Sequence, residues 1–214
     1  MKNFIFDLDG TLVDSIPVWE NVASKFLISK GVTPPKGIDD YFKTLALFQS
    51  SKYIAENLLP NMTPDEILRD ICNIVEDKYE NEVPLKKGVF KFLNDSYNMG
   101  IHMAILTASV YSYVEKALKN LKINHIFKEV ITCSSLGYAK DSYKVFDIAT
   151  NKLKFDKNNT IIFDDSLYAM KSAKKAGFTV VGVYDKDCSN EEECRKLCDK
   201  YIYSFEELKI NDFI

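Results

Sequence analysis

Two aspartates one residue apart, Asp7 and Asp9, end an apolar run that begins at Phe4, and Gly10 follows them. If that run is a strand, alternate side chains share a face, so both carboxylates point the same way. Carboxylates that close repel unless a cation or a proton offsets the charge. The pair suits Mg²⁺, or a reaction in which one carboxylate attacks while the other carries a proton. A strand end with a polar turn would explain Gly10 and Asp9, but not a charged Asp7 on a buried strand.

The composition is that of a globular protein with one large domain, or one domain with an insertion. The chain has 214 residues, of which 46% are apolar and 28% charged, and its formal net charge is −3. This charge gives no sign of a nucleic-acid-binding surface. No apolar stretch approaches the roughly 20 residues of a membrane span, and Asp7 would interrupt the apolar region of a signal peptide. We expect a cytoplasmic protein with no membrane or nucleic-acid partner.

The five cysteines are predicted to be free thiols, because their number is odd and no secretion signal precedes them. Cys194 and Cys198 would share one face of a helix, but a metal site there needs two further ligands. The two histidines, His102 and His125, lack ligand spacing. Packing of ordinary thiols is favoured over a metal or redox site.

Residues 16–83 show helical periodicity and no convincing strand. Apolar spacing predicts one helix over residues 18–27 and another over residues 50–59. A third helix should begin at Thr63, because Pro64 and Glu66 complete the pattern of a capping box. This segment is therefore expected to contain helices and no strand.

Beyond residue 84, short apolar runs alternate with helical patterns, which indicates a parallel sheet with helices on both faces. Strands are expected at residues 3–6, 101–106, 129–132, 160–163 and 179–183, with a short edge strand at 201–203. Helices are expected at residues 88–97, 110–121, 142–153, 167–176 and 190–198, followed by a terminal helical turn. The fold class is α/β: a doubly wound, Rossmann-like parallel sheet formed by residues 1–15 and 84–214, with residues 16–83 as an inserted α-helical domain.

In parallel α/β sheets, sites lie beyond the carboxyl ends of the strands, where the strand order reverses. The residues at or after the expected strand ends are Asp7, Asp9, Thr107, Lys140, Asp164 and Asp165. The topology would bring these acids, the hydroxyl and the cation to one edge. Taken one at a time, these residues have simpler explanations. Thr107 and Ser109 could cap a helix, Lys140 could be a surface lysine, and the aspartate pair could be a solvated turn.

Phosphoryl transfer has a role for each of these residues. Asp7 would attack phosphorus to form an aspartyl phosphate, and Asp9 would protonate the leaving oxygen and then take a proton from water. Mg²⁺ would be held by Asp7, Asp164 and Asp165, with the backbone carbonyl of Asp9 and waters completing its shell. Lys140 would neutralise phosphate oxygens. The hydroxyl of Thr107 and the amide of Ala108 would bind another phosphate oxygen.

The chain resembles the haloacid-dehalogenase-like superfamily, and specifically its phosphatase branch, over essentially its whole length. The resemblance rests on Asp7-Leu8-Asp9-Gly10-Thr11, Leu106-Thr107-Ala108-Ser109 and Phe163-Asp164-Asp165-Ser166. The inserted segment resembles the movable cap of the subfamily that includes phosphoglycolate phosphatases and β-phosphoglucomutase. Asp9 favours phosphate chemistry, because dehalogenases of this superfamily lack the second aspartate.

The third motif departs from the pattern. Relatives often have Lys-Pro-x-Pro, whereas both prolines are absent after Lys140. Lys144 is therefore an alternative for the phosphate-binding lysine. The resemblance places the substrate contacts in the cap, with hinges near residues 14–17 and 83–87. Candidate contacts there are Trp19, Tyr41, Lys43, Gln49 and Lys52, although each of these side chains could equally belong to the solvated face of an amphipathic helix.

The favoured function is Mg²⁺-dependent hydrolysis of a small phosphate monoester. One alternative is a phosphomutase resembling β-phosphoglucomutase, but relatives with that activity use a histidine of the first cap helix, where Trp19 stands here. Another is a non-enzymatic phosphoryl-receiver or binding protein, but receivers carry their acceptor aspartate on a later strand and lack a helical insertion. The expected partner is a small phosphorylated metabolite, and the expected state is a monomer or weak dimer.

Overall fold

The computed structural model describes residues 2–43 and 47–213. By its internal contacts the chain divides into two compact units. The core unit comprises Met1–Ser15 and Pro84–Ile214, and the helical unit comprises Ile16–Val83. Each unit is described by itself below. Within the described chain, no helix combines the length and the apolar character that a membrane span requires.

The core unit is built on a six-stranded sheet in which every strand pair is parallel, which confirms the predicted α/β class. The strands are β1 (Asn3–Phe6), β2 (His102–Thr107), β3 (Val130–Thr132), β4 (Thr160–Asp164), β5 (Thr179–Val183) and β6 (Lys200–Ile202). Their spatial order is β3-β2-β1-β4-β5-β6. The order reverses between β1 and β4, where Phe6 is in register with Phe163. Side chains that follow these two strands therefore emerge at one point.

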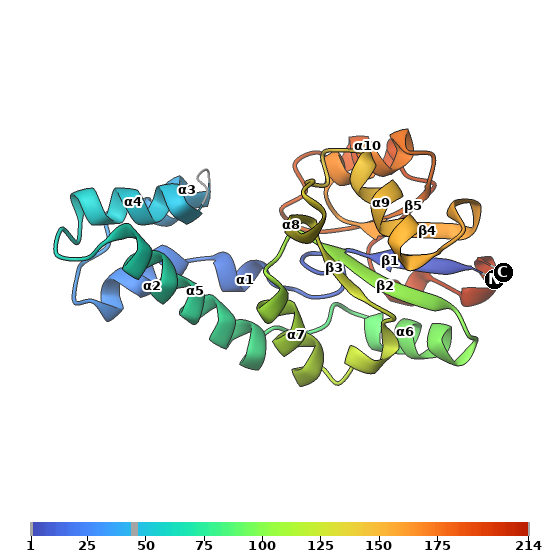
Figure 1. Ribbon diagram of the computed structural model, residues 1–214, viewed down its shortest axis with the longest axis horizontal. Coiled ribbons are helices and arrows are strands. Elements are labelled where there is room, and N and C mark those ends of the chain that lie inside the picture. The colour runs from blue at the N-terminus through green and yellow to red at the C-terminus, as the bar shows by residue number, and fades with distance from the viewer. Residues whose placement is uncertain (1, 44–46, 214) are drawn as a thin grey trace. The chain divides into compact units, whose positions relative to one another are not determined.

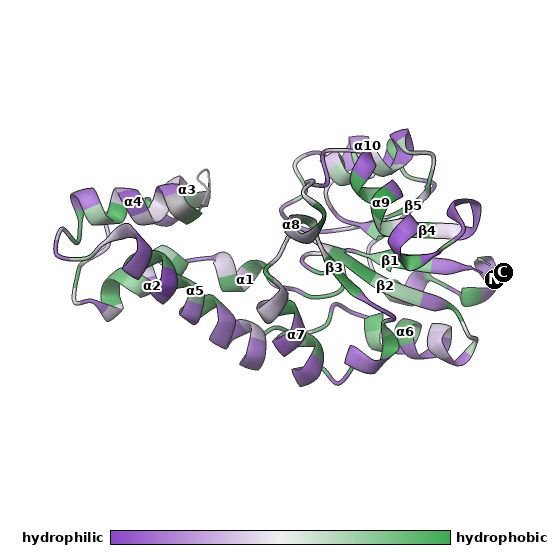
Figure 2. Ribbon diagram, viewed as in Figure 1, coloured by the Kyte–Doolittle hydropathy of each residue, from purple (hydrophilic) through white to green (hydrophobic). Residues whose placement is uncertain are grey.

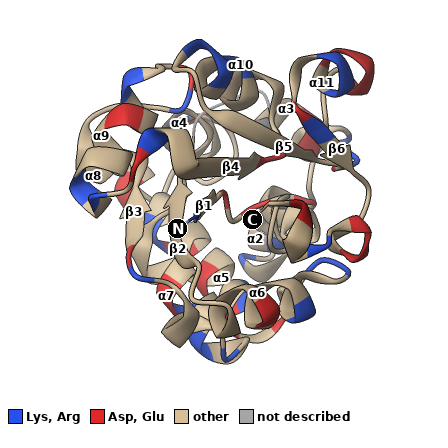
Figure 3. Cartoon of the chain, turned by 90° about the vertical axis from the view of Figure 1, so that its right-hand side faces the viewer, with Lys and Arg blue, Asp and Glu red and all other residues tan. Residues whose placement is uncertain are grey.

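Helices cover both faces of the sheet, with α6 and α7 on one side and α9 and α10 on the other (Figure 1). The α-helices of this unit are α6 (Val89–Asn98), α7 (Tyr111–Asn120), α8 (Cys133–Leu136), α9 (Lys144–Leu153), α10 (Leu167–Lys175) and α11 (Glu191–Leu197). Short 3₁₀ turns lie at Asn124–Ile126, Lys157–Asn159, Phe205–Glu207 and Ile210–Asp212. The central strands are hydrophobic along most of their length (Figure 2), and the charged residues gather mainly on the helices (Figure 3).

The side chains of β1 alternate between two hydrophobic layers. Phe4 and Phe6 face one layer, where Phe6 stacks on Phe163 with ring centroids 4.5 Å apart and Phe4 stacks on Phe92 of α6 at 5.8 Å. Ile5 belongs to the other layer, which is formed largely by α9 and α10. Both layers are buried, so β1 is a central strand that is packed on both faces of the sheet.

The helical unit consists of α1 (Ile16–Trp19), α2 (Val22–Ser29), α3 (Ile38–Lys43), α4 (Leu47–Asn57) and α5 (Pro64–Asn81). The single helix expected over residues 18–27 is wrong. It breaks at Asn21, whose φ of 61° is left-handed and ends the helical path. The capping box at Thr63 is confirmed, because its hydroxyl accepts from the amide of Glu66 and the carboxylate of Glu66 accepts from the amide of Thr63. Helix α3 was not predicted.

The two segments of the core unit that border the helical unit are hydrogen-bonded to each other. The Asp14 amide donates to the Pro84 carbonyl at 3.0 Å, and the Lys86 amide donates to the Leu12 carbonyl at 2.9 Å. Val13 and Leu85 form an antiparallel bridge between them. The chain therefore leaves and re-enters the core unit through neighbouring backbone segments.

The five cysteines are free, as predicted. Cys194 lies on α11 and Cys198 just beyond its end, but the sulfur of Cys194 lies 3.2 Å from that of Cys188. No third ligand joins this pair within 4.8 Å in the described part of the chain.

Candidate active site

The ends of β1 and β4 bring three carboxylates together at the reversal point of the sheet. Asp7 directly follows β1, and its amide donates to the Phe163 carbonyl at 2.8 Å, which keeps it on the ladder with β4. Asp164 ends β4 and Asp165 follows. Carboxylate oxygens of Asp7, Asp164 and Asp165 all lie within 4.8 Å of one another. Among the described residues, no other group of three potential metal ligands has its ligand atoms within this distance of one another.

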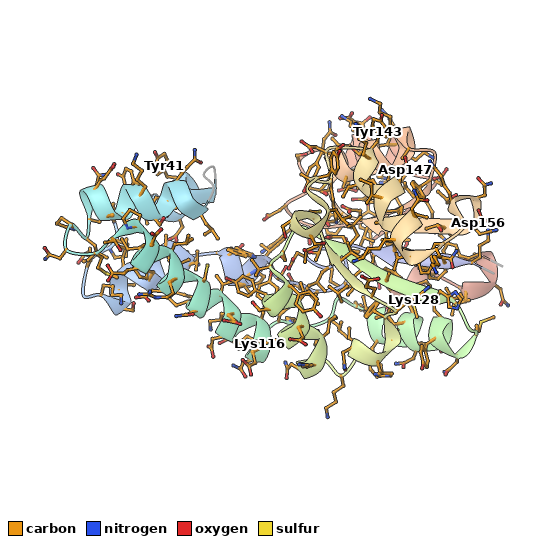
Figure 4. The ribbon with its side chains drawn as sticks, viewed as in Figure 1. Tyr41, Lys116, Lys128, Tyr143, Asp147 and Asp156 are labelled. Carbon is orange, nitrogen blue, oxygen red and sulfur yellow. The ribbon has the colours of Figure 1, made fainter. Side chains whose placement is uncertain are left out.

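Lys140 reaches this carboxylate cluster from the loop between α8 and α9. Its side chain is only 3% exposed, and Nζ donates to Asp7 Oδ1 and, at 2.8 Å, to Asp164 Oδ2. Gly137 ends α8 in the left-handed conformation with φ of 71°, which turns the chain into the loop that carries Lys140. The alternative residue, Lys144, is exposed at the start of α9, with its ammonium 5.9 Å from the ring centre of Tyr138. Tyr143, between the two lysines, lies at the surface (Figure 4).

Hydroxyl groups bind one oxygen of Asp164 and one of Asp165. The amide and the hydroxyl of Ser166 donate to Asp164 Oδ1 at 3.0 and 2.7 Å. The Thr11 hydroxyl donates to Asp165 Oδ1 at 3.0 Å. Gly10 has φ of 78°, and a Cβ there would lie 2.6 Å from Asp165 Oδ2. The turn after β1 therefore packs directly against Asp165 in a way that requires glycine.

The carboxylates carry more negative charge than Lys140 can offset. Burial, opposed by Lys140 and reinforced by the other aspartates, raises the pKa of Asp7 well above its usual value. Burial and then the charge of Asp164 raise the pKa of Asp165 to about 7. Burial alone would lower the pKa of Lys140, but Asp164 and Asp7 outweigh it and raise that pKa. Lys140 is thus a fixed cation in a site that favours a further positive charge.

Asp9 lies at the edge of this group and has a different partner. The Ser109 hydroxyl donates to Asp9 Oδ2 at 2.5 Å. The Thr107 hydroxyl is buried and accepts from the Ser109 amide at 3.0 Å, whereas Ala108 is exposed. The N-cap of α7 is Val110, which makes no side-chain cap. The end of β2 therefore turns toward Asp9. The Thr107 hydroxyl binds within that turn, whereas the Ser109 hydroxyl binds the Asp9 carboxylate.

Three contacts at the site were not predicted from the sequence: Thr11 to Asp165, Ser166 to Asp164, and Ser109 to Asp9. All three hydroxyls belong to the motif segments, so their position beside the acids was the available signal. Asp9 was predicted to contact the metal through its backbone carbonyl, and its carboxylate lies outside the group of three.

The predicted substrate residues all belong to the helical unit. Trp19 is half-buried and donates through Nε1 to the Tyr79 hydroxyl at 3.2 Å. Lys52 is exposed and lies 3.8 Å from Glu56, and Gln49 is exposed. Tyr41 lies at the surface of this unit (Figure 4). The side chain of Lys43 lies outside the described residues. These substrate contacts stay predictions.

The arrangement can support nucleophilic attack by a carboxylate on an electron-poor centre. Asp7 offers a buried oxygen at the tip of a rigid central strand, and Lys140 holds it in place. Asp9, less buried and hydrogen-bonded to a hydroxyl, is placed to exchange protons. The three clustered carboxylates match the oxygen ligands that Mg²⁺ prefers.

Comparison with known proteins gives consistent matches over nearly the whole chain. The model of the family described as haloacid dehalogenase-like hydrolase matches residues 4–183. Hexitol phosphatase B of Escherichia coli is 24% identical over 98% of this chain and 95% of its own. A phosphoglycolate phosphatase of Rhodobacter capsulatus is 28% identical over 83% of this chain and 81% of its own.

Solved structures share the fold. The β-phosphoglucomutase of Clostridium difficile superposes with a TM-score of 0.71 at 19% identity, covering 99% of this chain and 95% of its own. CbbY of Rhodobacter sphaeroides, solved in complex with phosphate, gives a TM-score of 0.78 at 18% identity, covering 97% and 96%. At these identities the likeness concerns the fold.

Proposed function

The chain belongs to the haloacid dehalogenase-like hydrolases, and from that premise we propose that it is a Mg²⁺-dependent phosphatase that hydrolyses small phosphate monoesters through an aspartyl phosphate on Asp7. The observation that carries the proposal is the cluster of Asp7, Asp164 and Asp165 with Lys140 at the reversal point of the sheet. Relatives named as phosphatases over most of both chains support the choice of phosphate esters.

The carboxylate cluster fits a magnesium ion. Three carboxylates share one site, the pKa values of Asp7 and Asp165 are raised, and one lysine cannot neutralise them all. A hard divalent cation bound by these oxygens would shield the nucleophile from the negative charge of the phosphate. Asp7, Asp164 and Asp165 are the side chains that would hold it, together with the backbone carbonyl of Asp9.

In the first step, an Asp7 oxygen attacks phosphorus and the bond between phosphorus and the leaving oxygen breaks. Asp9 gives its proton to that leaving oxygen. In the second step, water attacks the phosphorus of the aspartyl phosphate, its proton passes to Asp9, and the bond to Asp7 breaks to release inorganic phosphate. Lys140 binds phosphate oxygens, and Thr107 and the Ala108 amide bind another.

The natural substrate in this proposal is a small phosphorylated metabolite, hydrolysed by a cytoplasmic monomer or weak dimer. The helical unit would act as a cap whose side chains, Trp19, Lys43, Gln49 and Lys52 among them, contact the part of the substrate beyond the phosphate. The location, the oligomeric state and the identity of that substrate stay predictions.

The test is turnover of a panel of sugar phosphates, polyol phosphates, phosphoglycolate and nucleotides with Mg²⁺, with and without EDTA. Asp7→Asn should abolish phosphate release, because an amide is not a nucleophile, and Asp147→Asn is the surface control, since Asp147 is 38% exposed and pairs with Lys157. Asp9→Asn should slow both steps. Intact-protein mass after acid quenching should show one phosphoryl group on the wild type and none on Asp7→Asn.

Near-normal turnover by Asp7→Asn would refute the covalent mechanism, and full activity in EDTA would refute the role of the cation. Analysis of the products adds a separate decision. An isomerised sugar phosphate in place of inorganic phosphate would identify the alternative activity, a phosphomutase.

A further inference from the structure

Lys86 lies where the chain re-enters the core unit, three residues beyond the end of the helical unit at Val83. Its side chain is 17% exposed, so most of it is buried although it carries a charge. Nothing in the proposed mechanism uses this lysine. A largely buried ammonium outside the carboxylate cluster therefore needs an explanation of its own.

The ammonium of Lys86 is bound by three oxygens from two other segments. Nζ donates to the Gly10 carbonyl at 2.5 Å, to the Tyr184 carbonyl at 2.6 Å and to Asp185 Oδ2 at 2.9 Å. An ammonium has three donors, so these acceptors use all of them. Asp185 is 4% exposed, and its other oxygen accepts from the Asp187 amide at 3.0 Å. Lys86 thus joins the turn after β1, the re-entry segment and the loop after β5.

The Gly10 carbonyl is the contact that matters for chemistry. Gly10 directly follows Asp9, and its α-carbon is packed against Asp165 so closely that a Cβ would lie 2.6 Å from Oδ2. The next residue, Thr11, holds the other oxygen of Asp165 at 3.0 Å. A displacement of the Gly10 peptide would therefore shift both Asp9 and the hydroxyl that orients Asp165.

We infer that Lys86 is a positioning residue, whose ammonium, held by Asp185 and the Tyr184 carbonyl, fixes the Gly10 peptide and through it the carboxylate of Asp9. The inference rests on the proposed function, since it assigns Lys86 to the same reaction. Lys86 touches neither the substrate phosphate nor the carboxylate cluster, so its removal should affect the rate of the chemical steps rather than binding of the ester. Misplacement of a reacting group by about 1 Å can cost on the order of a hundredfold in rate.

The neighbouring residue provides a matched control. Lys87 also forms an ion pair, 2.9 Å from Glu206, but its side chain is 75% exposed and that of Glu206 is 56% exposed. The two lysines are adjacent in sequence, have the same charge and have similar pair distances. They differ in burial and in the tie to Gly10. Lys87→Met therefore removes the same charge from the same segment without touching the turn after β1.

The experiment compares kcat, KM and the urea midpoint of Lys86→Met, Lys87→Met, Asp185→Asn and the double variant Lys86→Met/Asp185→Asn, with p-nitrophenyl phosphate and Mg²⁺. Lys86→Met should lower kcat by at least about tenfold with KM within about threefold, and Lys87→Met should change neither. Lys86→Met leaves Asp185 buried and unpaired, so its urea midpoint should fall. In the double variant the midpoint should recover while kcat stays low, because the tie to Gly10 is still missing.

Three results would overturn either the inference about Lys86 or the proposed function. Loss of turnover that recovers together with stability in the double variant would overturn the inference, because unpaired charge on Asp185 would then explain it. A Lys86→Met variant with more than half the wild-type kcat would overturn it as well. A wild type that hydrolyses no ester refutes the proposed function instead. If Lys86→Met does not fold, the double variant and Lys86→Arg test the inference instead. Lys86→Arg keeps the charge and should keep more of kcat than the double variant.

Discussion

Replacing Lys140 by methionine tests whether the buried cation holds the carboxylate cluster together. The side chains of Lys140 and Asp164 are 3% and 1% exposed, and that of Asp7 is 10% exposed. Methionine keeps most of the side-chain volume but removes the charge, so two buried carboxylates lose their partner. Removal of one member of a buried ion pair costs about 3–5 kcal/mol of the free energy of unfolding. We expect a loss in that range for the metal-free protein at neutral pH.

A half-exposed ion pair gives the reference for this loss. Lys171 lies 2.5 Å from Glu193, with side-chain exposures of 51% and 43%. Exposed pairs of this kind contribute about 0.2–1 kcal/mol, so Lys171→Met should cost less than about 1 kcal/mol. The two variants remove the same charge at similar pair distances, and burial is the main difference between them.

The assay is urea denaturation of both variants and the wild type at pH 7.5, in EDTA and in excess Mg²⁺. Mg²⁺ should recover part of the stability of Lys140→Met, because a divalent cation bound by Asp7 and Asp164 would replace the missing charge. Turnover should stay at least about a hundredfold low, since the lysine proposed to bind phosphate oxygens is absent. Equal losses for Lys140→Met and Lys171→Met would refute the reasoning, and so would a loss below about 1 kcal/mol for Lys140→Met.

Three further outcomes are expected. The pKa of Asp165 is raised to about 7, so between about pH 4 and 7 the metal-free native state holds a proton that the unfolded chain has lost. The free energy of unfolding of the metal-free protein should therefore fall by about 2 kcal/mol between pH 5 and 7. Asp165→Asn should reduce this fall in urea titrations. Gly10→Ala should cost at least about 2 kcal/mol more than Gly137→Ala, since both have positive φ but a Cβ meets Asp165 only at Gly10; equal midpoints would contradict this. Ser109→Ala should lower kcat about tenfold with little change in KM, because it removes the hydrogen bond to Asp9, and an unchanged kcat would exclude that role.

The parallel sheet was predictable because its strands are short apolar runs separated by helical patterns. Residues 160–163 illustrate this, since Ile161, Ile162 and Phe163 read as a strand buried on both faces and form the centre of β4. Asn21 shows the limit. Apolar spacing continues through it without interruption, so the periodicity did not predict that α1 and α2 are separate. The residue type was the available signal, because asparagine adopts the left-handed conformation more readily than other non-glycine residues. Helix α8 was missed because four residues are too few to show a period.

The candidate site was predictable where it depends on strand ends, and less so where it depends on loops. Asp7 and Asp164 follow from topology alone, since parallel strands end at the same edge. Lys140 and Lys144 could not be separated in the sequence. The turn at Gly137 and the burial of one lysine distinguish them only after folding.

Lys86 and Lys87 are a second pair of lysines that the sequence does not distinguish. They are identical in type and adjacent, yet one is 17% and the other 75% exposed. The difference arises from partners about a hundred residues away, Tyr184 and Asp185, which local patterns do not encode. Long-range contacts of charged side chains in loops are therefore the part of the site that sequence reasoning could not reach.

The backbone bridge between Val13 and Leu85 has a consequence for how such proteins diversify. Because the chain departs and returns at adjacent points, the interruption behaves thermodynamically like one long hairpin loop. The entropy of closing such a loop rises only with the logarithm of its length, so lengthening, shortening or exchanging the insert costs the sheet little. Recombination can therefore replace the helical unit without altering the strand register of the sheet. The core unit and the helical unit can then evolve independently of each other.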